Sequence, residues 1–314
     1  MSDKNDFLLK DFGKIIKRNM LSIRHELGND TDAFRIYDRN IDELSIVVEK
    51  YAKYLRIIDF SDGTISDEMM EQIRDICYRM SYVQKENVFT VSRKKDRSCE
   101  LNLKTNNSIR TLCMESGLIF EVEMLSYTDS GLFLENVYAR RFIRDCSSGL
   151  RVLNLFSYTG SFGLYAASGG AKEIFNVDIS ENYTKWAERN IHNNGFSPEI
   201  CRCICSDAKQ FIDSSVKNNN KYDIIIFDPP VFSNSRKMDY DFRAERDSIP
   251  WLLNLCRVLT KDGFILFCNN SRSLKEGKIK NAGLKYLCKS GEFRAPGFIK
   301  KNRVGKTSHY LIFN

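Results

Sequence analysis

The pattern of hydrophobic and polar residues changes near residue 150. Beyond that point, short apolar runs alternate with segments whose apolar residues recur at helical spacing. The predicted strands are at about residues 151–156, 173–178, 199–205, 222–228 and 263–268. The predicted helices are at about residues 160–168, 180–193, 207–216 and 247–259. Because strands alternate with helices, we expect an α/β fold with a doubly wound parallel sheet that binds ligands at the carboxyl ends of its strands.

The first part of the chain has a mixed pattern of helix and strand. Apolar residues at helical spacing predict an amphipathic helix over residues 8–27. Ser66 is the expected N-cap of a second helix, which ends near Tyr82. The predicted strands of this part are at residues 34–38, 44–51, 54–60 and 88–91. These elements predict a smaller α+β domain with its own apolar faces.

Three parts of the chain are expected from these patterns. Residues 109–114 and 118–125 are expected to pair as a hairpin, and a helix is expected over residues 128–143. The polar, turn-rich stretch at residues 94–108 is the candidate linker. The predicted parts are an N-terminal α+β module at residues 1–105, a connecting hairpin at residues 106–130 and the larger α/β domain at residues 131–314.

The first strand of the α/β domain ends in a turn rich in Ser, Thr and Gly. Gly160 has no Cβ and can take positive φ, so backbone N–H groups of the turn can approach a ligand closely. Asp178 lies about 20 residues further on, where an acid can accept both hydroxyls of a ribose. The turn lacks the three glycines that admit a dinucleotide pyrophosphate. It therefore suits a nucleoside without phosphates, such as S-adenosylmethionine, although a generic α/β turn is the alternative.

Two later strand ends carry further polar groups. The fourth strand ends at Asp228, and Pro229 and Pro230 follow it in a rigid loop, because proline fixes φ and removes backbone donors. Asp207, after the third strand, is expected either to accept from an adenine amino group or to cap the next helix, and both roles are compatible. The carboxyl ends of parallel strands meet at one edge of the sheet, so these acids are expected near Gly160.

Composition and cysteine usage set limits on the class of protein. The chain has 314 residues, 42% of them hydrophobic, which is enough for two domains. Its first residues are polar and no apolar run approaches the ~20 residues of a membrane helix, so we expect a cytoplasmic protein without a membrane partner. Ten cysteines without an export signal are expected to be reduced thiols. Cys201, Cys203 and Cys205 are interpreted as small buried side chains sharing one strand face, and no metal site is predicted.

The positive charge is concentrated near the end of the sequence. The net charge is +7, and between residues 272 and 306 only Glu276 and Glu292 oppose a run of basic residues. The basic residues of this segment are Arg272, Lys275, Lys278, Lys280, Lys285, Lys289, Arg294, Lys300, Lys301, Arg303 and Lys306. One-signed clustering favours a polyanion partner, and nucleic acid is preferred over an ordinary basic surface.

Several segments resemble the guanine-N7 methyltransferase half of the bifunctional bacterial 23S rRNA methyltransferases, and more loosely the related cytosine-C5 rRNA methyltransferases. The matching segments are residues 35–38, 48–52, 129–134, 154–161, 186–190, 228–235 and 269–270. The most specific are Phe-Ser-Tyr-Thr-Gly-Ser, from Phe156, and Asp-Pro-Pro-Val-Phe-Ser-Asn-Ser, from Asp228. The family's Asp-His-Arg appears here as Glu135-Asn136-Val137, and Cys268 stands where the family has Ser.

The resemblance implies a Rossmann-like class I methyltransferase that uses S-adenosylmethionine and modifies a base of large-subunit ribosomal RNA, most specifically guanine N7. Together with the strand ends, it predicts a cofactor site made of Asn154, Phe156, Ser157, Tyr158, Thr159, Gly160, Ser161, Asp178, Ile179, Ser180, Asp207, Ala208 and Asp228. The predicted catalytic residues, which hold the target base, are Asp228, Pro229, Pro230, Phe232 and Asn234. Phe232 is expected to stack on the base and Ser233 or Asn234 to bond its edge. The N-terminal module is expected to bind RNA.

Three other functions are weighed against this one, of which a small-molecule methyltransferase is the weakest, because it leaves the basic segment at residues 272–306 unexplained. A cytosine-C5 methyltransferase needs a thiolate that attacks carbon 6, and Cys268 is the candidate nucleophile, although a buried strand-end cysteine is the preferred interpretation. A catalytically silent RNA-binding module would keep the fold without the chemistry, and the intact acids Asp178, Asp207 and Asp228 argue against it. The oligomeric state and the modified nucleotide are left open by the sequence.

Overall fold

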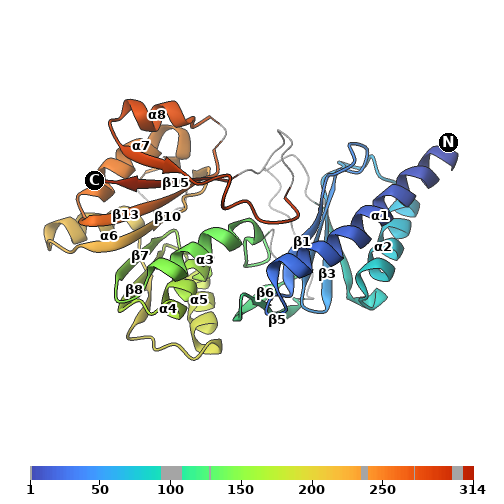
Figure 1. The fold of residues 1–314 in the computed structure, drawn as a ribbon, viewed down its shortest axis with the longest axis horizontal. Helices are drawn as coiled ribbons and strands as arrows, with labels where there is room; N and C mark the ends of the chain where they lie inside the picture. The colour runs from blue at the N-terminus through green and yellow to red at the C-terminus, as the bar shows by residue number, and fades with distance from the viewer. Residues whose placement is uncertain (1, 93–107, 127–128, 235–239, 272, 299–306) are drawn as a thin grey trace. The chain divides into compact units, whose positions relative to one another are not determined.

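A computed structural model describes residues 2–92, 108–126, 129–234, 240–271, 273–298 and 307–314. The chain divides into two compact units (Figure 1). Unit 1 is Met1–Leu134 with Ala295–Lys301, and unit 2 is Glu135–Arg294 with Asn302–Asn314. The predicted linker falls almost wholly outside the described residues, as do Arg272, Lys300, Lys301, Arg303 and Lys306. The domain limits near residues 105 and 130 stay predictions.

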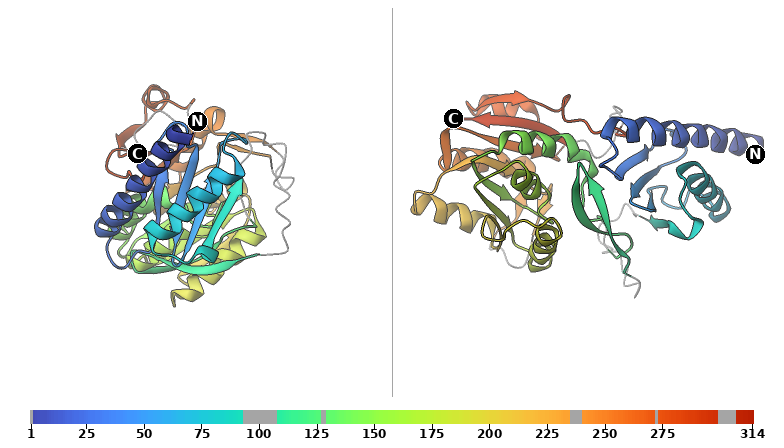
Figure 2. Two further views of the ribbon diagram at one scale, coloured as in Figure 1. Left: turned by 90° about the vertical axis from the view of Figure 1, so that its right-hand side faces the viewer. Right: turned by 60° about the horizontal axis from the view of Figure 1, so that its bottom comes forward.

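Unit 1 is built on a four-stranded sheet of order β1-β2-β3-β4. Its strands are β1 (Ala33–Asp38), β2 (Ile46–Tyr51), β3 (Tyr54–Asp59) and β4 (Val88–Ser92), and its helices are α1 (Ser2–Leu27) and α2 (Asp67–Ser81). Only β3 and β4 are parallel, because α2 supplies the crossover between them. Both helices lie on one face of the sheet (Figure 2). The predicted elements are confirmed, including the N-cap of α2, where Ser66 Oγ accepts from the Met69 N–H at 3.2 Å.

The hairpin belongs to unit 1. Strands β5 (Arg110–Glu115) and β6 (Leu118–Glu123) pair as predicted. Elsewhere in unit 1, a short 3₁₀ helix, η1 (Lys85–Asn87), precedes β4. The Asp32 carboxylate accepts from the Met114 N–H at 2.7 Å, which ties β5 to the segment before β1. The helix expected over residues 128–143 begins later than predicted. A 3₁₀ turn, η2 (Leu134–Asn136), precedes α3 (Val137–Cys146), and Thr128 lies outside the described residues.

Unit 2 contains a seven-stranded sheet of order β14-β15-β13-β10-β7-β8-β9. The strands are β7 (Arg151–Leu155), β8 (Glu173–Asp178), β9 (Cys201–Cys205), β10 (Tyr222–Phe227), β13 (Leu259–Asn269), β14 (Lys285–Cys288) and β15 (Ser308–Phe313). The helices after α3 are α4 (Ser161–Ser168), α5 (Glu181–Asn193), α6 (Ala208–Lys217), α7 (Ala244–Cys256) and α8 (Glu276–Asn281). The five strands predicted from the sequence are parallel, and the α/β fold class is confirmed. Strands β14 and β15, which were not predicted, add an antiparallel edge.

The chain order of this sheet reverses between β7 and β10. From β7 the chain moves outward through β8 to β9, whereas β10 lies on the other side of β7 and is followed by β13. Leu155 and Phe227 are register partners, so the turn after β7 and the loop after β10 leave the sheet side by side. Such a reversal leaves a crevice outside the carboxyl ends of the strands, where open α/β sheets bind ligands.

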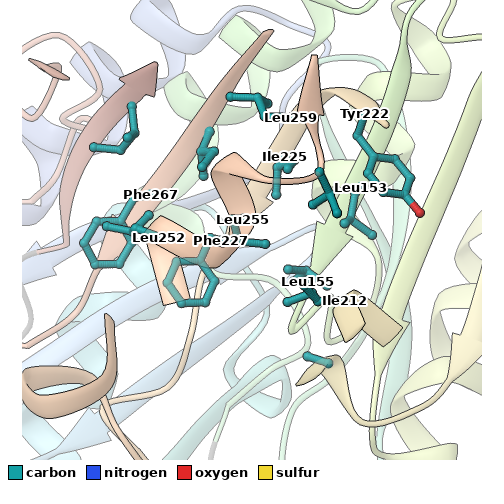
Figure 3. Packing of buried hydrophobic residues seen from close by; sticks show 14 of the residues in the cluster. Leu153, Leu155, Ile212, Tyr222, Ile225, Phe227, Leu252, Leu255, Leu259 and Phe267 are labelled. Atoms are coloured by element: carbon teal, nitrogen blue, oxygen red, sulfur yellow. The ribbon is translucent and has the colours of Figure 1, made fainter. Parts of the chain in front are cut away.

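One face of the sheet carries a hydrophobic core of unit 2 (Figure 3). Leu153 and Leu155 of β7 and Phe227 of β10 pack there against Leu252 of α7 and Ile212 of α6. The rigidity of this core fixes the strand ends from which the polar loops emerge. None of the helices in the described ranges combines the length and apolar character needed to cross a bilayer.

The opposite face carries a pair of buried amides. Asn154 of β7 donates from Nδ2 to Asn176 Oδ1 of β8 at 2.9 Å, and both side chains are almost fully buried. Helix α4 packs directly over this pair at Gly163, where an added Cβ would overlap the Asn176 amide. The glycine therefore lets the helix that follows the first turn approach the sheet closely.

Replacing Gly163 with Ala is expected to destabilise unit 2 by ~1–3 kcal/mol, because the new methyl group overlaps an amide that a hydrogen bond holds in place. Urea unfolding followed by far-UV circular dichroism measures the change. The matched control is Gly277→Ala in α8, where nothing lies within 4 Å of the new Cβ and the expected change is within about 0.5 kcal/mol. Equal effects at the two glycines would contradict the close approach of α4.

The three alternating cysteines lie on β9, at the edge of the sheet. Cys201 is buried, Cys203 is partly buried and Cys205 is exposed. Burial is thus confirmed for Cys201 and wrong for Cys205. Cys205 ends β9, which has no neighbouring strand on its outer side among the residues that the structure describes. Across the described ranges, no group of three or more His, Cys, Asp or Glu side chains is arranged to hold a metal ion.

Candidate functional site at the carboxyl edge of the sheet

The turn after β7 has an unusual backbone. Phe156, Tyr158 and Gly160 all have positive φ, at 55°, 52° and 78°. Two non-glycine residues in this left-handed region each cost about 1–2 kcal/mol, so the surroundings must hold the turn in shape. The Ser157 N–H donates to the Val177 carbonyl at 3.0 Å, and the Gly160 N–H donates to the Ser157 carbonyl at 2.8 Å. The predicted positive φ of Gly160 is confirmed, and strain of this kind is typical of functional turns.

Asp178 joins this turn to the end of β8. Its Oδ2 accepts from the Tyr158 N–H and its Oδ1 from the Ser180 N–H, both at 2.9 Å. Burial raises the pKa of this carboxyl group, and the two backbone donors oppose that rise. A carboxylate has about four acceptor sites, so each oxygen still has capacity for one ribose hydroxyl. Ile179 and Ser180 follow directly, and Ser180 caps α5.

The remaining atoms of the turn are those predicted to hold the methionine end of S-adenosylmethionine. Ser157 Oγ is buried without a hydrogen-bond partner among the described residues, which is the state expected of a group that bonds a ligand. Thr159 is buried, and its carbonyl accepts from Asn190 Nδ2 at 3.0 Å, which fixes the turn against α5. Ser161 begins α4. The turn would therefore hold the amino-acid end of the cofactor, and Asp178 would hold its ribose.

Two residues of the predicted cofactor set have side chains engaged elsewhere. The Phe156 ring packs in an aromatic cluster, 5.6 Å from the Trp251 ring and 5.9 Å from the Phe227 ring between centroids. Asn154 is buried in the sheet and uses its amide to bind Asn176. The roles of both residues at the cofactor site therefore stay predictions.

Asp207 is the N-cap of α6, as the sequence allowed. Its Oδ1 accepts from the Gln210 N–H at 2.9 Å, while its Oδ2 accepts from the Tyr240 hydroxyl at 2.9 Å. Ala208, the first residue of α6, is buried beside it. The adenine contact of Asp207 stays a prediction. Tyr240 was missed, because a tyrosine 33 residues from its partner leaves no local pattern in the sequence.

Asp228 follows β10 and is held from two sides. Asn270 Nδ2 donates to its Oδ1 at 2.9 Å, and Asn136 Nδ2 donates to its Oδ2 at 3.4 Å. Burial raises the pKa of Asp228 from 3.8 to about 7; the Asn270 bond and Arg140 lower it, and Glu135 raises it. This carboxyl group therefore changes charge near neutral pH. Asn136 and Glu135 occupy positions of the segment that departs from the family sequence.

The loop after Asp228 presents an aromatic ring to solvent. Pro229 is buried and Pro230 is exposed. Phe232 is 44% exposed, and the Arg243 guanidinium lies 5.3 Å from its ring centroid. A two-residue ladder between β11 (Phe232–Ser233) and β12 (Phe242–Arg243) fixes the backbone at this point. Asn234 is exposed, and Ser235 lies outside the described residues.

Cys268 lies in β13 and is fully buried, as preferred from the sequence. Burial raises the pKa of its thiol well above the ordinary value, and the neighbouring Asp228 raises it further. A thiol that is neither accessible nor ionised is a poor nucleophile. Its burial argues against the covalent chemistry of a cytosine-C5 methyltransferase.

Comparison with known proteins gives the following matches. A family model described as "S-adenosylmethionine-dependent methyltransferase" matches residues 68–281. A ribosomal RNA large subunit methyltransferase K/L from Shewanella baltica is 34% identical over 78% of this chain and 35% of its own length. The protein of the same name from Colwellia psychrerythraea is 31% identical, over 88% of this chain and 39% of its own length. The chain thus spans well under half the length of these relatives.

Solved structures share the fold. A candidate SAM-dependent methyltransferase from Streptococcus mutans superposes with a TM-score of 0.72 at 18% identity, covering 97% of this chain and 81% of its own. A SAM-dependent methyltransferase from Agrobacterium tumefaciens superposes with a TM-score of 0.63 at 19% identity, covering 91% of this chain and 90% of its own. Both matches extend over the two units.

Proposed function

Because this chain belongs to the S-adenosylmethionine-dependent methyltransferase family, we propose that it transfers a methyl group from S-adenosylmethionine to a base of large-subunit ribosomal RNA. The observation that carries the proposal is that two polar loops leave adjacent strands at the point where the strand order of the sheet reverses. The turn that holds Asp178 and the loop that starts at Asp228 leave neighbouring strands side by side. A nucleoside cofactor and a target base would each have one carboxylate there.

Ribosomal RNA is proposed as the substrate on two grounds. The curated relatives carry that substrate in their names, and exposed basic residues cluster in unit 2. The exposed basic residues of this cluster in the described ranges are Lys275, Lys278, Lys280, Lys285 and Arg294, while Lys289 is partly buried and pairs with Glu292. Phosphate contacts from such residues would add sequence-independent affinity that falls steeply with salt. An enzyme of ribosomal RNA would work in the cytoplasm, and the N-terminal module would supply further RNA contacts.

Guanine N7 is the proposed target atom. This nitrogen carries an exposed lone pair and no proton, so positioning in a shielded site suffices and no nucleophile or base is required. S-adenosylmethionine would supply the methyl group. An ionised Asp228 would accept from the donor edge of guanine, and Phe232 would stack on the ring. Pro229 and Pro230 would keep the loop rigid, and Ser233 or Asn234 would bond the base edge. Extruding the base costs a few kcal/mol, of which one aromatic stack returns ~1–3 kcal/mol.

The decisive experiment is methyl transfer by the purified protein. Large-subunit and small-subunit ribosomal RNA from cells that lack the protein would be incubated with labelled S-adenosylmethionine, and the nucleosides analysed by mass spectrometry. The proposal expects 7-methylguanosine in large-subunit RNA alone. Label in 5-methylcytidine would favour the chemistry assigned to Cys268, while cofactor binding without label would favour a silent RNA-binding module.

Replacing Phe232 with Ala is expected to lower kcat/KM for RNA by about 5- to 100-fold, because a base stack contributes ~1–3 kcal/mol. The affinity for S-adenosylmethionine should not change, since the ring lies on the base-binding loop. Phe232→Tyr keeps the aromatic face and should retain activity. Leu253→Ala, a similarly exposed apolar residue on α7, is the control. A Phe232→Ala enzyme with full activity would remove the stacking role.

A further inference from the structure

The Asp228 carboxylate is held by side chains that lie far away in the sequence. Asn136, at the end of η2, and Asn270, just after β13, each donate one amide N–H to a different carboxylate oxygen. Each amide is itself held on its other side. Thr307 Oγ1 donates to Asn270 Oδ1 at 2.6 Å, and His309 Nε2 lies 2.9 Å from Asn136 Oδ1. Two chains of hydrogen bonds thus converge on one carboxyl group.

The direction of the His309 chain follows from hydrogen-bond chemistry. An ionised carboxylate only accepts, so Asn136 must turn its NH₂ group toward Asp228 and its carbonyl oxygen toward His309. His309 Nε2 must then carry a proton. The imidazole is 2% exposed, and burial lowers its pKa to about 4, so it is neutral and Nδ1 is bare. Consistent with that tautomer, Nδ1 has no hydrogen-bond partner among the described residues.

We propose that Asn136 and His309 are positioning residues, which hold the Asp228 carboxylate ionised and aimed at the target base through a donor chain from His309 to Asn136 to Asp228. The inference deepens the proposed function and rests on it in one respect, the contact of Asp228 with the base. Neither residue needs to touch the base or the cofactor. Their contribution is to orient one carboxylate and to fix its charge.

The charge of Asp228 is finely balanced by its surroundings. The ionised form is disfavoured by burial and by Glu135 of η2, and favoured by Asn270 and by Arg140 of α3. Cys268 of β13 is protonated and adds no charge. Since these influences leave the pKa of Asp228 at about 7, the loss of one donor changes the ionised fraction at neutral pH substantially.

The ionised form also selects the base. Guanine presents two neighbouring donors, N1–H and the N2 amino group, which match the two oxygens of a carboxylate. A protonated Asp228 would offer a donor instead, and would suit a base with a ring-nitrogen acceptor at that edge. The donor chain is therefore expected to favour guanine over cytosine and adenine.

The test compares variants of the full chain. His309→Phe keeps a ring but removes the donor, Asn136→Leu keeps the side-chain shape but removes the amide, and His309→Gln restores an N–H donor. In the first two variants the acidic limb of the kcat/KM profile for RNA should move to higher pH by roughly 0.5–1 unit, with ~3- to 10-fold lower activity at pH 7. The affinity for S-adenosylmethionine should not change. His309→Gln should recover most of the loss, and His192→Gln, an exposed histidine on α5, is the control.

The outcomes separate this inference from the proposed function. If the wild type methylates ribosomal RNA but the folded variants keep its pH profile, the positioning role is wrong and the proposed function stands. If the wild type transfers no methyl group, the charge of Asp228 can still be followed through stability. The quantity measured is the difference in unfolding free energy that Asp228→Asn causes, plotted against pH. In the Asn136→Leu background this plot should be displaced to higher pH, and a plot that is not displaced overturns the inference. If His309→Phe does not fold, Asn136→Leu decides alone. If neither folds, both residues are structural and the inference is also wrong.

Discussion

Replacement of Asp178 with Ala is expected to weaken S-adenosylmethionine binding by at least ~100-fold. A hydrogen bond to a charged group contributes about 1.5–3 kcal/mol, and a carboxylate that accepts both ribose hydroxyls makes two of them. The substitution also leaves the Tyr158 and Ser180 N–H groups without their carboxylate, so the strained turn loses one of its supports. Isothermal titration calorimetry with the cofactor and with S-adenosylhomocysteine measures the loss directly.

A matched control excludes a general effect of losing an acid. Asp213 is an exposed residue of α6 whose carboxylate pairs with Lys209 at 2.8 Å. Asp213→Ala should bind the cofactor as the wild type does, because surface ion pairs contribute little. If Asp178→Ala still bound the cofactor with wild-type affinity and unfolded as the wild type does, the turn after β7 would not be the cofactor site.

Replacement of Asp228 with Asn is expected to lower kcat for RNA methylation by at least ~100-fold, a loss much larger than any change in cofactor affinity. Misplacing a reacting group by about 1 Å can cost that much, and the amide cannot accept at both of its atoms. In the wild type, kcat/KM should rise with pH through about 7 and level off above it, because only the ionised Asp228 accepts from the base. Asp228→Asn should show no such limb.

The stability of the protein offers a second measurement of the same charge. The pKa of Asp228 is raised from 3.8 to about 7 in the folded protein, so the native state holds a proton that the unfolded chain has released between those values. This group therefore lowers the free energy of unfolding as the pH rises from about 4 to 7. Asp228→Asn should lack that contribution in denaturant titrations. A wild-type profile with no Asp228-dependent fall would contradict the raised pKa.

The sequence predicted the strand-end acids because strand ends are local patterns. A parallel sheet brings its carboxyl ends to one edge whatever the exact register, so Asp178, Asp207 and Asp228 could be grouped before any contact was known. The N-cap of α2 and the positive φ of Gly160 were predictable for a similar reason, since a single residue type favours each geometry.

The residues that were missed depend on contacts between distant parts of the chain. His309 reaches Asn136 across 173 positions, and only because β15 inserts between β13 and β14. No pattern within a short window encodes that insertion. Phe156 was expected at the ligand, but its ring turns into the aromatic cluster around Trp251. Sequence does not specify positive φ at a phenylalanine, so the direction of that ring could not be predicted.

The short ladder between β11 and β12 lies between the predicted adenine site and the proposed base-binding loop. Tyr240 bonds Asp207 at the predicted adenine end, and two positions later Phe242 begins β12, whose partner strand carries Phe232. A shift of the Tyr240 hydroxyl on cofactor binding would therefore act, three residues along the chain, on the strand that pairs with Phe232. Such a linkage would favour ordered addition, with the cofactor entering first and the nucleic acid second.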